Sequence, residues 1–365
     1  MARSPFSARA SLGPLGAILN VLREVDVRPV RIAAETPFLI AFVSRDVPFA
    51  EHLAALMYRG DRPTDTPTHR AAVGAPISDA VRISRANVVV IVTRDDAQAD
   101  DEMRLKRGLE ASGTAVLVCF VRERSASWSP TQNVALDHAI VLPLDDGTLD
   151  ERAAIQRLTE AIRRLKVIDD LALARYLPAF REPVVRALIE DVAMANASYS
   201  LGSGLLQINP ATGLPVAVAD TVILTKNQAV MAYKIALAMG LPADFKHVML
   251  QIAGVIGGGL IFRQVARSLV GWLPGLGIVP KVVVAFAGTF AIGEAVYRWS
   301  RSGERLTEDS LRVIYALAVQ RGRALLSRLR RRRAARSAES WRKPDLPQRE
   351  VVEFPSASPR HAATP

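Results

Sequence analysis

The sequence predicts an α/β domain followed by an all-α apolar helical domain. In the first part of the chain, four apolar segments alternate with stretches long enough for helices, which is typical of a mostly parallel sheet covered on both faces. These segments span residues 37–43, 87–93, 115–121 and 139–144. After Lys166 the strand patterns stop and apolar residues recur at helical spacing. From Asn227 onward the chain is apolar enough for contact with lipid to be considered.

Composition and charge exclude several classes of protein. The 365 residues are 50% hydrophobic and 23% charged, which argues against a wholly disordered chain. The single cysteine, Cys119, excludes an intrachain disulfide and a zinc site of paired thiolates, and its place in an apolar strand predicts a buried, inert thiol. The formal charge of +11 is concentrated in residues 321–345, which contribute a net +8 from ten basic and two acidic side chains.

Local signals divide the chain into six segments. Thr148 and Glu151 have the spacing of a capping box, which predicts a helix up to about Lys166. Glycines and prolines between residues 198 and 222 favour a loop with one short helix. The predicted segments are a leader helix (1–34), an α/β domain (35–167), a helical connector and loop (168–225), an apolar, membrane-associated helical domain (226–305), a basic helix (306–336) and a disordered tail (337–365).

Two apolar blocks, residues 248–262 and 268–293, predict a helical hairpin that associates with a membrane. Pro274-Gly275 and Pro280 break the second block, and no uninterrupted run reaches the roughly 20 residues of a spanning helix. Spanning, re-entrant, interfacial and buried placements therefore stay open, with a soluble hairpin as the alternative. The residues predicted to contact the membrane are Val248, Ile252, Gly257, Phe262, Trp272, Pro274, Gly275, Val283, Phe286 and Phe290.

The first strand is not followed by a loop that could bind phosphate. Phosphate-binding loops use glycine-rich backbone and a lysine at a helix N-terminus. Here residues 44–51 contain neither glycine nor lysine, and Asp46 and Glu51 would repel an anion. The sequence therefore predicts no cofactor and no specific binding of GTP or ATP.

The first part of the chain nevertheless resembles the G domain of bacterial dynamin-like and Era-like GTPases. The resemblance rests on Leu22-Arg23-Glu24-Val25-Asp26 with Arg28-Pro29 before a strand, and on Arg85-Ala86-Asn87 before another. Residues 120–123 (Phe-Val-Arg-Glu) occupy the place of the family's base-reading Asn-Lys-x-Asp motif. No nucleotide-binding residue carries over, so the resemblance implies a degenerate G-domain-like sheet, a pseudo-GTPase.

A second resemblance covers residues 220–303. The string Leu224-Thr225-Lys226-Asn227-Gln228, then Met231 and Gly240, Gly271 with residues 274–277, Gly288-Thr289 and Gly293 resembles a helical domain of unknown function. That domain accompanies GTPases and forms the C-terminal part of YcjF-like bacterial inner-membrane proteins. The resemblance implies membrane association and a GTPase partner, with no catalytic activity.

A competing resemblance points to an enzyme. Phe42-Val43-Ser44-Arg45-Asp46, Phe49-Ala50-Glu51, residues 77–91 and Asp100-Asp101-Glu102 resemble the Toll/interleukin-receptor domain, some members of which cleave NAD with a glutamate. Glu102 is the nearest candidate for that glutamate. The tryptophan and cysteine that usually precede it are absent.

Other candidate sites are weaker. The five histidines show no close metal-ligand spacing, and Gly202-Ser203-Gly204 lacks the outer glycines of a nucleophile elbow. The run Arg330, Arg331, Arg332 and Arg333 follows the apolar blocks, which favours anionic lipid on the cytoplasmic side over nucleic acid or a merely solvated helix end.

Taken together, these patterns predict a protein that is not an enzyme and lies on the cytoplasmic face of the inner membrane, with a multi-pass arrangement left open. Its expected partners are membrane lipids and a GTPase with a related helical domain; a homo-oligomer stays open and nucleic acid is not expected. The alternatives are an NAD-cleaving Toll-like effector and a soluble basic scaffold.

Overall fold

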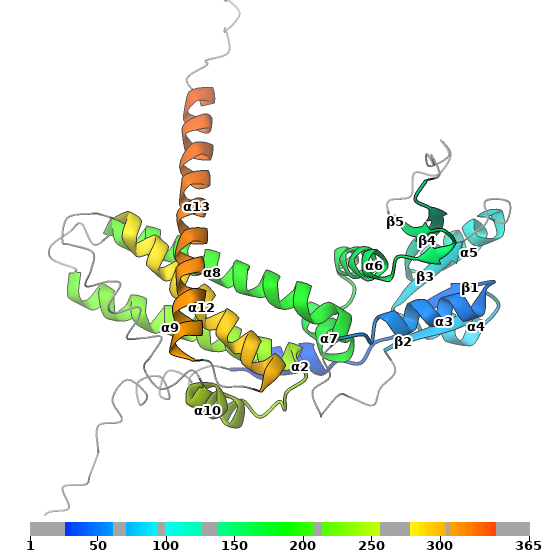
Figure 1. The fold of residues 1–365 in the computed structure, drawn as a ribbon, viewed down its shortest axis with the longest axis horizontal. Helices are drawn as coiled ribbons and strands as arrows, with labels where there is room; N and C mark the ends of the chain where they lie inside the picture. Colours follow the sequence, from blue (N-terminus) through cyan, green and yellow to red (C-terminus); the bar gives the residue numbers. More distant parts are fainter. Residues whose placement is uncertain are drawn as a thin grey trace, which may run out of the picture. The chain divides into compact units, whose positions relative to one another are not determined.

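A computed structural model describes residues 26–60, 71–93, 99–125, 138–206, 213–255, 278–303 and 307–340 (Figure 1). The chain forms two compact units, residues 1–322 and 323–365, and both the sheet and the helical bundle described below belong to the first.

The sheet has six strands in the order β2-β1-β3-β4-β5-β6, with the first five parallel and β6 antiparallel to β5. The strands are β1 (Ile40–Ser44), β2 (Ala72–Pro76), β3 (Val88–Thr93), β4 (Ala115–Glu123), β5 (Ala139–Asp145) and β6 (Thr148–Leu149). The four predicted strands are confirmed. The sequence missed β2, which contains glycine and ends on proline, and the two-residue β6, because neither has a long apolar run.

Helices on both faces of the sheet explain why its strands are almost entirely apolar. Ile83, Met103, Leu105 and Leu109 pack against one face. They come from α4 (Ala80–Arg85) and α5 (Ala99–Ala111), whereas α3 (Val47–Leu56) and α6 (Glu151–Leu165) contact strands from the opposite side. Gly74 in β2 allows α3 to approach closely, since a Cβ there would lie 2.4 Å from the backbone nitrogen of Glu51.

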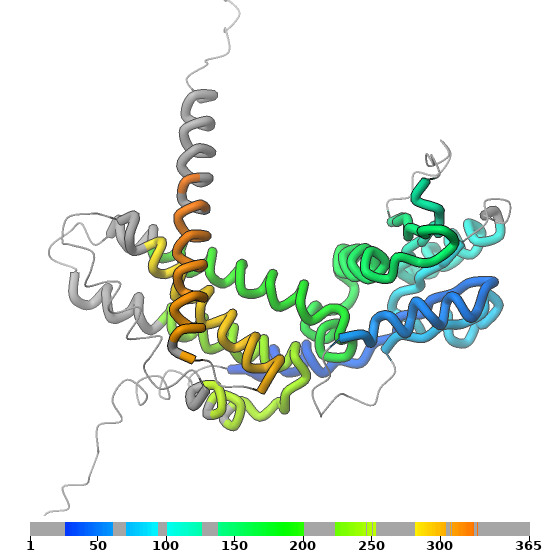
Figure 2. Tube along the Cα trace, viewed as in Figure 1, coloured from blue at the N-terminus to red at the C-terminus, as the bar shows by residue number. Residues whose placement is uncertain are grey.

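Helices α8 (Arg181–Leu206), α9 (Gly213–Ala238) and α12 (Ile278–Ser302) pack together as a bundle. Figure 2 shows α8 and α12 side by side, and the contacts of Ile189 with Gly293 and of Asn196 with Thr289 establish that they run antiparallel. The remaining helical elements are α2 (Arg28–Glu35), α7 (Asp170–Tyr176), the 3-10 helix η2 (Pro178–Phe180), α10 (Phe245–Val255) and α13 (Glu308–Ser340).

The coarse prediction, a mostly parallel α/β sheet followed by a helical region, is confirmed. The predicted loop over residues 198–222 is wrong over most of its length, because α8 continues through Gly202 and Gly204. Helix α9 begins at Gly213 with Pro215 in its first turn, where a proline costs no hydrogen bond. The cap of α6 is Asp150 and not Thr148, which lies in β6. The predicted leader up to residue 25 and the tail from residue 341 lie outside the described residues.

Candidate functional site

The carboxyl edge of the sheet is the first place to look for a ligand site. In doubly wound sheets of order 2-1-3-4-5, ligands bind outside the carboxyl ends of the strands, where the direction of winding reverses. Here that point lies between β1, which ends at Ser44, and β3, which ends at Thr93. The Ser44 hydroxyl donates to the backbone oxygen of Val92 (3.0 Å) and thereby joins the two strand ends.

Aspartates of the chain cap the helices that begin at this edge. Asp46 accepts from the amide of Phe49 at the start of α3 (3.1 Å), and Pro48 has no amide hydrogen to offer. Asp79 caps α4 in the same way by accepting from the amide of Arg82 (3.0 Å). A helix N-terminus attracts phosphate through its unpaired amides and its positive dipole end. At α3 and α4 a carboxylate already accepts from one of these amides, and its negative charge would repel an incoming phosphate.

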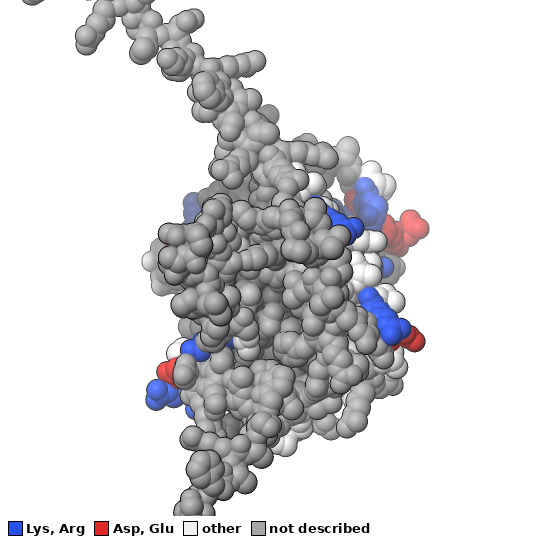
Figure 3. Space-filling view, turned by 90° about the vertical axis from the view of Figure 1, so that its left-hand side faces the viewer, with Lys and Arg blue, Asp and Glu red and all other residues white. Residues whose placement is uncertain are grey.

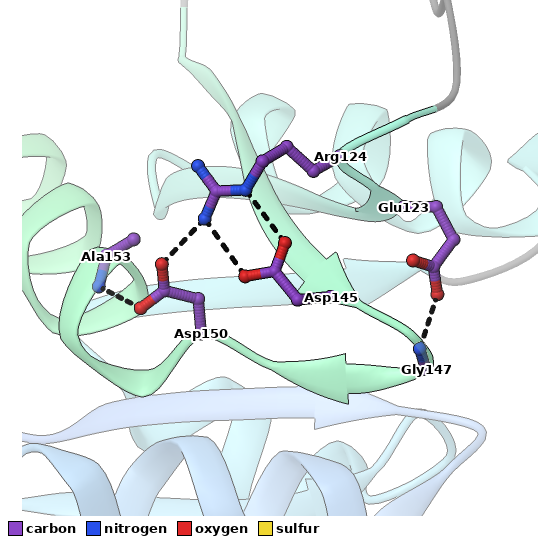
Figure 4. Close-up of polar contacts among 6 residues, drawn as sticks. All are labelled: Glu123, Arg124, Asp145, Gly147, Asp150 and Ala153. Atoms are coloured by element: carbon purple, nitrogen blue, oxygen red, sulfur yellow. Dashed lines mark hydrogen bonds and ion pairs between the residues drawn. The ribbon is translucent and has the colours of Figure 1, made fainter.

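An aspartate also caps α6, where it belongs to an ion-pair cluster (Figure 4). Asp150 accepts from the amide of Ala153 (3.0 Å) and from Arg124 (2.7 Å), which also binds Asp145 through its Nε (2.8 Å). The hydrogen bond from the Ala153 amide, followed by that from Arg124, lowers the pKa of Asp150. The hydrogen bond to Asp145 and its charge raise the pKa of the Arg124 guanidinium.

This cluster lies at the end of β4, directly after residues 120–123, which replace the base-reading motif of the GTPases that the sequence resembles. Glu123, the last residue of β4, accepts from the amide of Gly147 in the turn between β5 and β6 (2.8 Å, Figure 4). Gly147 has a φ of +78°, a conformation that favours glycine. Glu123 and Arg124 therefore fix the turn and the start of α6, which gives them a structural task.

Glu102, the glutamate of the Toll-like resemblance, lies in the first turns of α5, the helix that follows β3. Its side chain is buried, with 3% of the residue exposed. The neighbouring Asp101 binds Arg45, from the loop after β1, and Arg104, each at 2.6 Å. The structure thus brings Glu102, Asp101 and Arg45 to the point where the winding reverses.

A second charged cluster connects α3 to the start of α6. Glu151 accepts from both terminal nitrogens of Arg59, at 2.9 Å for the Nη2–Oε1 pair, and lies 3.1 Å from the Nε2 of His52. The hydrogen bond from Arg59, with a smaller contribution from His52, lowers the pKa of Glu151. His52 therefore contacts a carboxylate. Among the described residues, no three or more His, Cys, Asp or Glu side chains are placed to hold a metal ion.

The bundle contains a polar network buried among apolar side chains. Asn196 of α8 donates to the hydroxyl of Thr289 in α12 (2.9 Å) and accepts from Asn227 of α9 (2.7 Å), while Gln228 of α9 also donates to Thr289 (3.1 Å). Asn196 and Thr289 are completely buried. The sequence singled out Asn227, Gln228 and Thr289. It missed Asn196, whose surroundings in the sequence are those of any polar residue in a helix.

The residues predicted to contact lipid are buried in protein wherever the structure describes them. Those described are Val248, Ile252, Val283, Phe286 and Phe290, each at most 6% exposed. One helical stretch within the described residues, Val282–Ser302, is long and apolar enough to cross a membrane. However, 78% of its apolar 18-residue segment is buried inside the protein, as the core helix of a soluble protein also is. The structure thus offers one weak candidate, which does not support a multi-pass arrangement.

The other predicted contact residues cannot be placed. Gly257, Phe262, Trp272, Pro274 and Gly275 lie outside the described residues. The run from Arg330 to Arg333 lies within α13, and its side chains are outside what the structure describes. Cys119 is buried in β4 as predicted, and burial raises the pKa of its thiol.

Comparisons with known proteins identify no relative: no family model, no curated protein and no solved structure matches the chain.

Proposed function

We propose that this chain is a non-catalytic, membrane-associated partner or regulator of a GTPase that carries a related helical domain. The observation that carries the proposal is the capping of α3, α4 and α6 by Asp46, Asp79 and Asp150. In a nucleotide-binding α/β protein, phosphate sits at the N-terminus of the helix that follows the first strand, and that helix is α3 here. Here the N-termini of these helices are capped by aspartates of the chain itself. This arrangement supports a degenerate G-domain-like module that binds a partner protein and not a nucleotide.

The network of Asn196, Asn227, Gln228 and Thr289 supports the helical half of the proposal. Three of these four residues belong to the string that resembles the GTPase-associated helical domain, and together they join three helices. Polar side chains buried in helix bundles fix register and partner choice in well-studied coiled coils. A partner with the same helical domain would present the same kind of helix surface.

Two measurements test this function with the full-length chain. Titration with magnesium and GTP in a calorimeter should give no binding heat, and a micromolar dissociation constant would exclude a pseudo-GTPase. Crosslinking in the source cell, followed by purification, should yield a GTPase with an intact phosphate-binding loop. Addition of this chain should then change the rate of GTP hydrolysis by that enzyme, whereas an unchanged rate would exclude a regulatory role.

A specific observation favours one second candidate, the Toll-like NAD-cleaving enzyme. Glu102 is buried, and it directly follows Asp101, which pairs with Arg45 from the loop after β1. Incubation with NAD should then release nicotinamide, and Glu102→Gln should abolish the release. Glu110→Gln is the matched control, because Glu110 lies on the same helix and pairs with Lys106 (2.6 Å). No nicotinamide release by the parent chain excludes this activity.

A further inference from the structure

The two edge strands of the sheet carry outward-facing backbone groups that no strand of the described sheet pairs with. β2 lies at one edge, and β5 lies at the other except where the two-residue β6 pairs with its end. In a parallel ladder, the amide and the carbonyl of every second residue point to the same side. Such a row of backbone groups is a template for the addition of another strand, from a partner or from a second copy of the chain.

The outward-facing residues of β2 are Ala72, Gly74 and Pro76. The residues that alternate with them face β1, because the carbonyl of Ala71 accepts from the amide of Ile40 (2.8 Å) and the pairing of β1 with β2 continues in register from there. The outward-facing positions are therefore the ones that an added strand would have to reach.

Tyr58 closes the first of these positions with its hydroxyl. The hydroxyl oxygen accepts from the amide of Ala72 (2.8 Å), and the hydroxyl donates to the carbonyl of the same residue (3.2 Å). A tyrosine hydroxyl can do both at once, since it has one hydrogen and an oxygen that accepts. The side chain thus makes the two hydrogen bonds that a residue of an added strand would make with Ala72.

The backbone on both sides of Tyr58 is anchored to other elements. The carbonyl of Met57 accepts from the amide of Ala179 in η2 (3.1 Å), and the side chain of Met57 is completely buried. Arg59 binds Glu151 at the start of α6, at 2.9 Å for the Nη2–Oε1 pair. These contacts hold Tyr58 at the edge of the sheet.

The other outward-facing positions of β2 also have partners within the chain. Arg82 of α4 donates to the carbonyl of Gly74 (3.3 Å). Pro76 has no amide hydrogen, and its carbonyl accepts from the amide of Asp79 (3.0 Å). Arginines of this chain often pair with acidic side chains, and several blue side chains adjoin red ones in Figure 3. Arg82 does so with Asp79 (3.4 Å), but it binds the edge strand as well.

The opposite edge of the sheet is closed in a similar way. The outward-facing carbonyls of β5 before β6 include those of Val141 and Pro143, because the residues that alternate with them bond to β4. Arg157 of α6 donates to the carbonyl of Val141, and the amide of Asp150 donates to that of Pro143 (3.1 Å). Pro143 has no amide hydrogen to offer to another strand.

We infer that the chain's own side chains close both edges of the sheet to strand addition, and that Tyr58 is the contact that keeps the β2 edge closed. Its hydroxyl binds an outward amide and an outward carbonyl, whereas Arg82 binds one carbonyl. Without these two contacts, the strand that the edge accepts is β2 of a second copy, because two antiparallel copies of one edge are complementary by symmetry. This inference goes beyond the proposed function, and it implies that a partner protein binds the parent chain at a surface other than these edges.

Hydrogen exchange resolved to single amides tests the contact in the full-length chain. In Tyr58→Phe at low protein concentration, the Ala72 amide should exchange about tenfold faster than in the parent, because the hydroxyl that accepts from it is gone. Tyr176→Phe is the matched control, since that hydroxyl also donates to a backbone carbonyl, the one of Glu35 (3.0 Å), but away from the β2 edge. Exchange at Ala72 should be unchanged in the control. Circular dichroism establishes that both variants are folded.

Sedimentation velocity tests the closure of the edge. Tyr58→Phe combined with Arg82→Ala should self-associate about tenfold more tightly than the parent, because outward groups of Ala72 and Gly74 then become available to a second copy. The Ala72 amide of this combined variant should regain protection from exchange as the protein concentration rises. Tyr176→Phe should sediment like the parent.

Unchanged exchange at Ala72 in Tyr58→Phe would exclude the contact itself. If the combined variant sediments like the parent, or if it associates while its Ala72 amide stays unprotected, Tyr58 does not keep this edge closed.

Discussion

In the α/β region, charged side chains pair at the exposed edge of the sheet, whereas in the bundle uncharged polar side chains pair in the core. Arg124 and Asp145 are each 55% exposed, while Asn196 and Thr289 are completely buried. An exposed ion pair contributes little because water already solvates both partners. A buried polar group that loses its hydrogen-bond partner destabilises the fold by its full desolvation free energy. The two regions should therefore respond differently to the loss of a polar contact.

The two regions also differ in how their elements approach each other. At Gly74, the atoms closest to an added Cβ belong to the backbone of Glu51. At Gly293, the neighbour is the side chain of Ile189, whose Cγ1 would lie 2.6 Å away. A backbone held in a helix cannot move aside, but a side chain has alternative rotamers.

The largest effect is expected for Gly74→Ala. The new methyl group would overlap the backbone of α3, so the helix would have to move away from the sheet. We expect a loss of about 3 kcal/mol in the free energy of unfolding, measured by urea titration. Gly108→Ala is the control, because a Cβ at Gly108 meets nothing within 4 Å and alanine favours the helix. A loss no larger than that of the control would show that α3 is not held at this distance.

Removal of Asn196, the centre of the polar network, should cause the second largest loss of stability. Asn196→Ala leaves Thr289 and Asn227 without this partner in the core, at a cost of about 2 kcal/mol. Asn196→Ala combined with Thr289→Val should cost less than the sum of the single changes, because the two residues share a hydrogen bond. Strict additivity in the double-mutant cycle would mean that this bond is absent in solution.

Gly293→Ala should be milder, at about 1 to 2 kcal/mol, because Ile189 can partly adjust. In an Ile189→Ala background the same glycine substitution should cost at least about 1 kcal/mol less, since the clashing atoms are gone. An unchanged cost would show that α8 and α12 are further apart than the structure has them.

Acid should slightly reduce the contribution of the two exposed ion-pair clusters to the stability of the fold. Folding lowers the pKa of Asp150 and of Glu151. Their contribution to the free energy of unfolding is therefore fully present above the pKa values that they have in the unfolded chain, about 4. It is lost as the pH falls through the lowered values of the folded chain, because the unfolded chain then binds more protons. Urea titrations between pH 7 and pH 3 should show this decline, and Arg59→Gln should flatten it. An equally steep decline in that variant would exclude Arg59 as the cause.

The sequence alone determined the four long strands, the helical character of the second part and the burial of Cys119, because apolar periodicity is a local property. It also singled out Asn227, Gln228 and Thr289, but it did not predict that these residues form one hydrogen-bonded network. Tertiary structure decided the order of the strands, the capping role of Asp46, Asp79 and Asp150, and the burial of Val283, Phe286 and Phe290 against other helices. An apolar helix has the same sequence pattern in a protein core and in lipid, so only its neighbours distinguish the two.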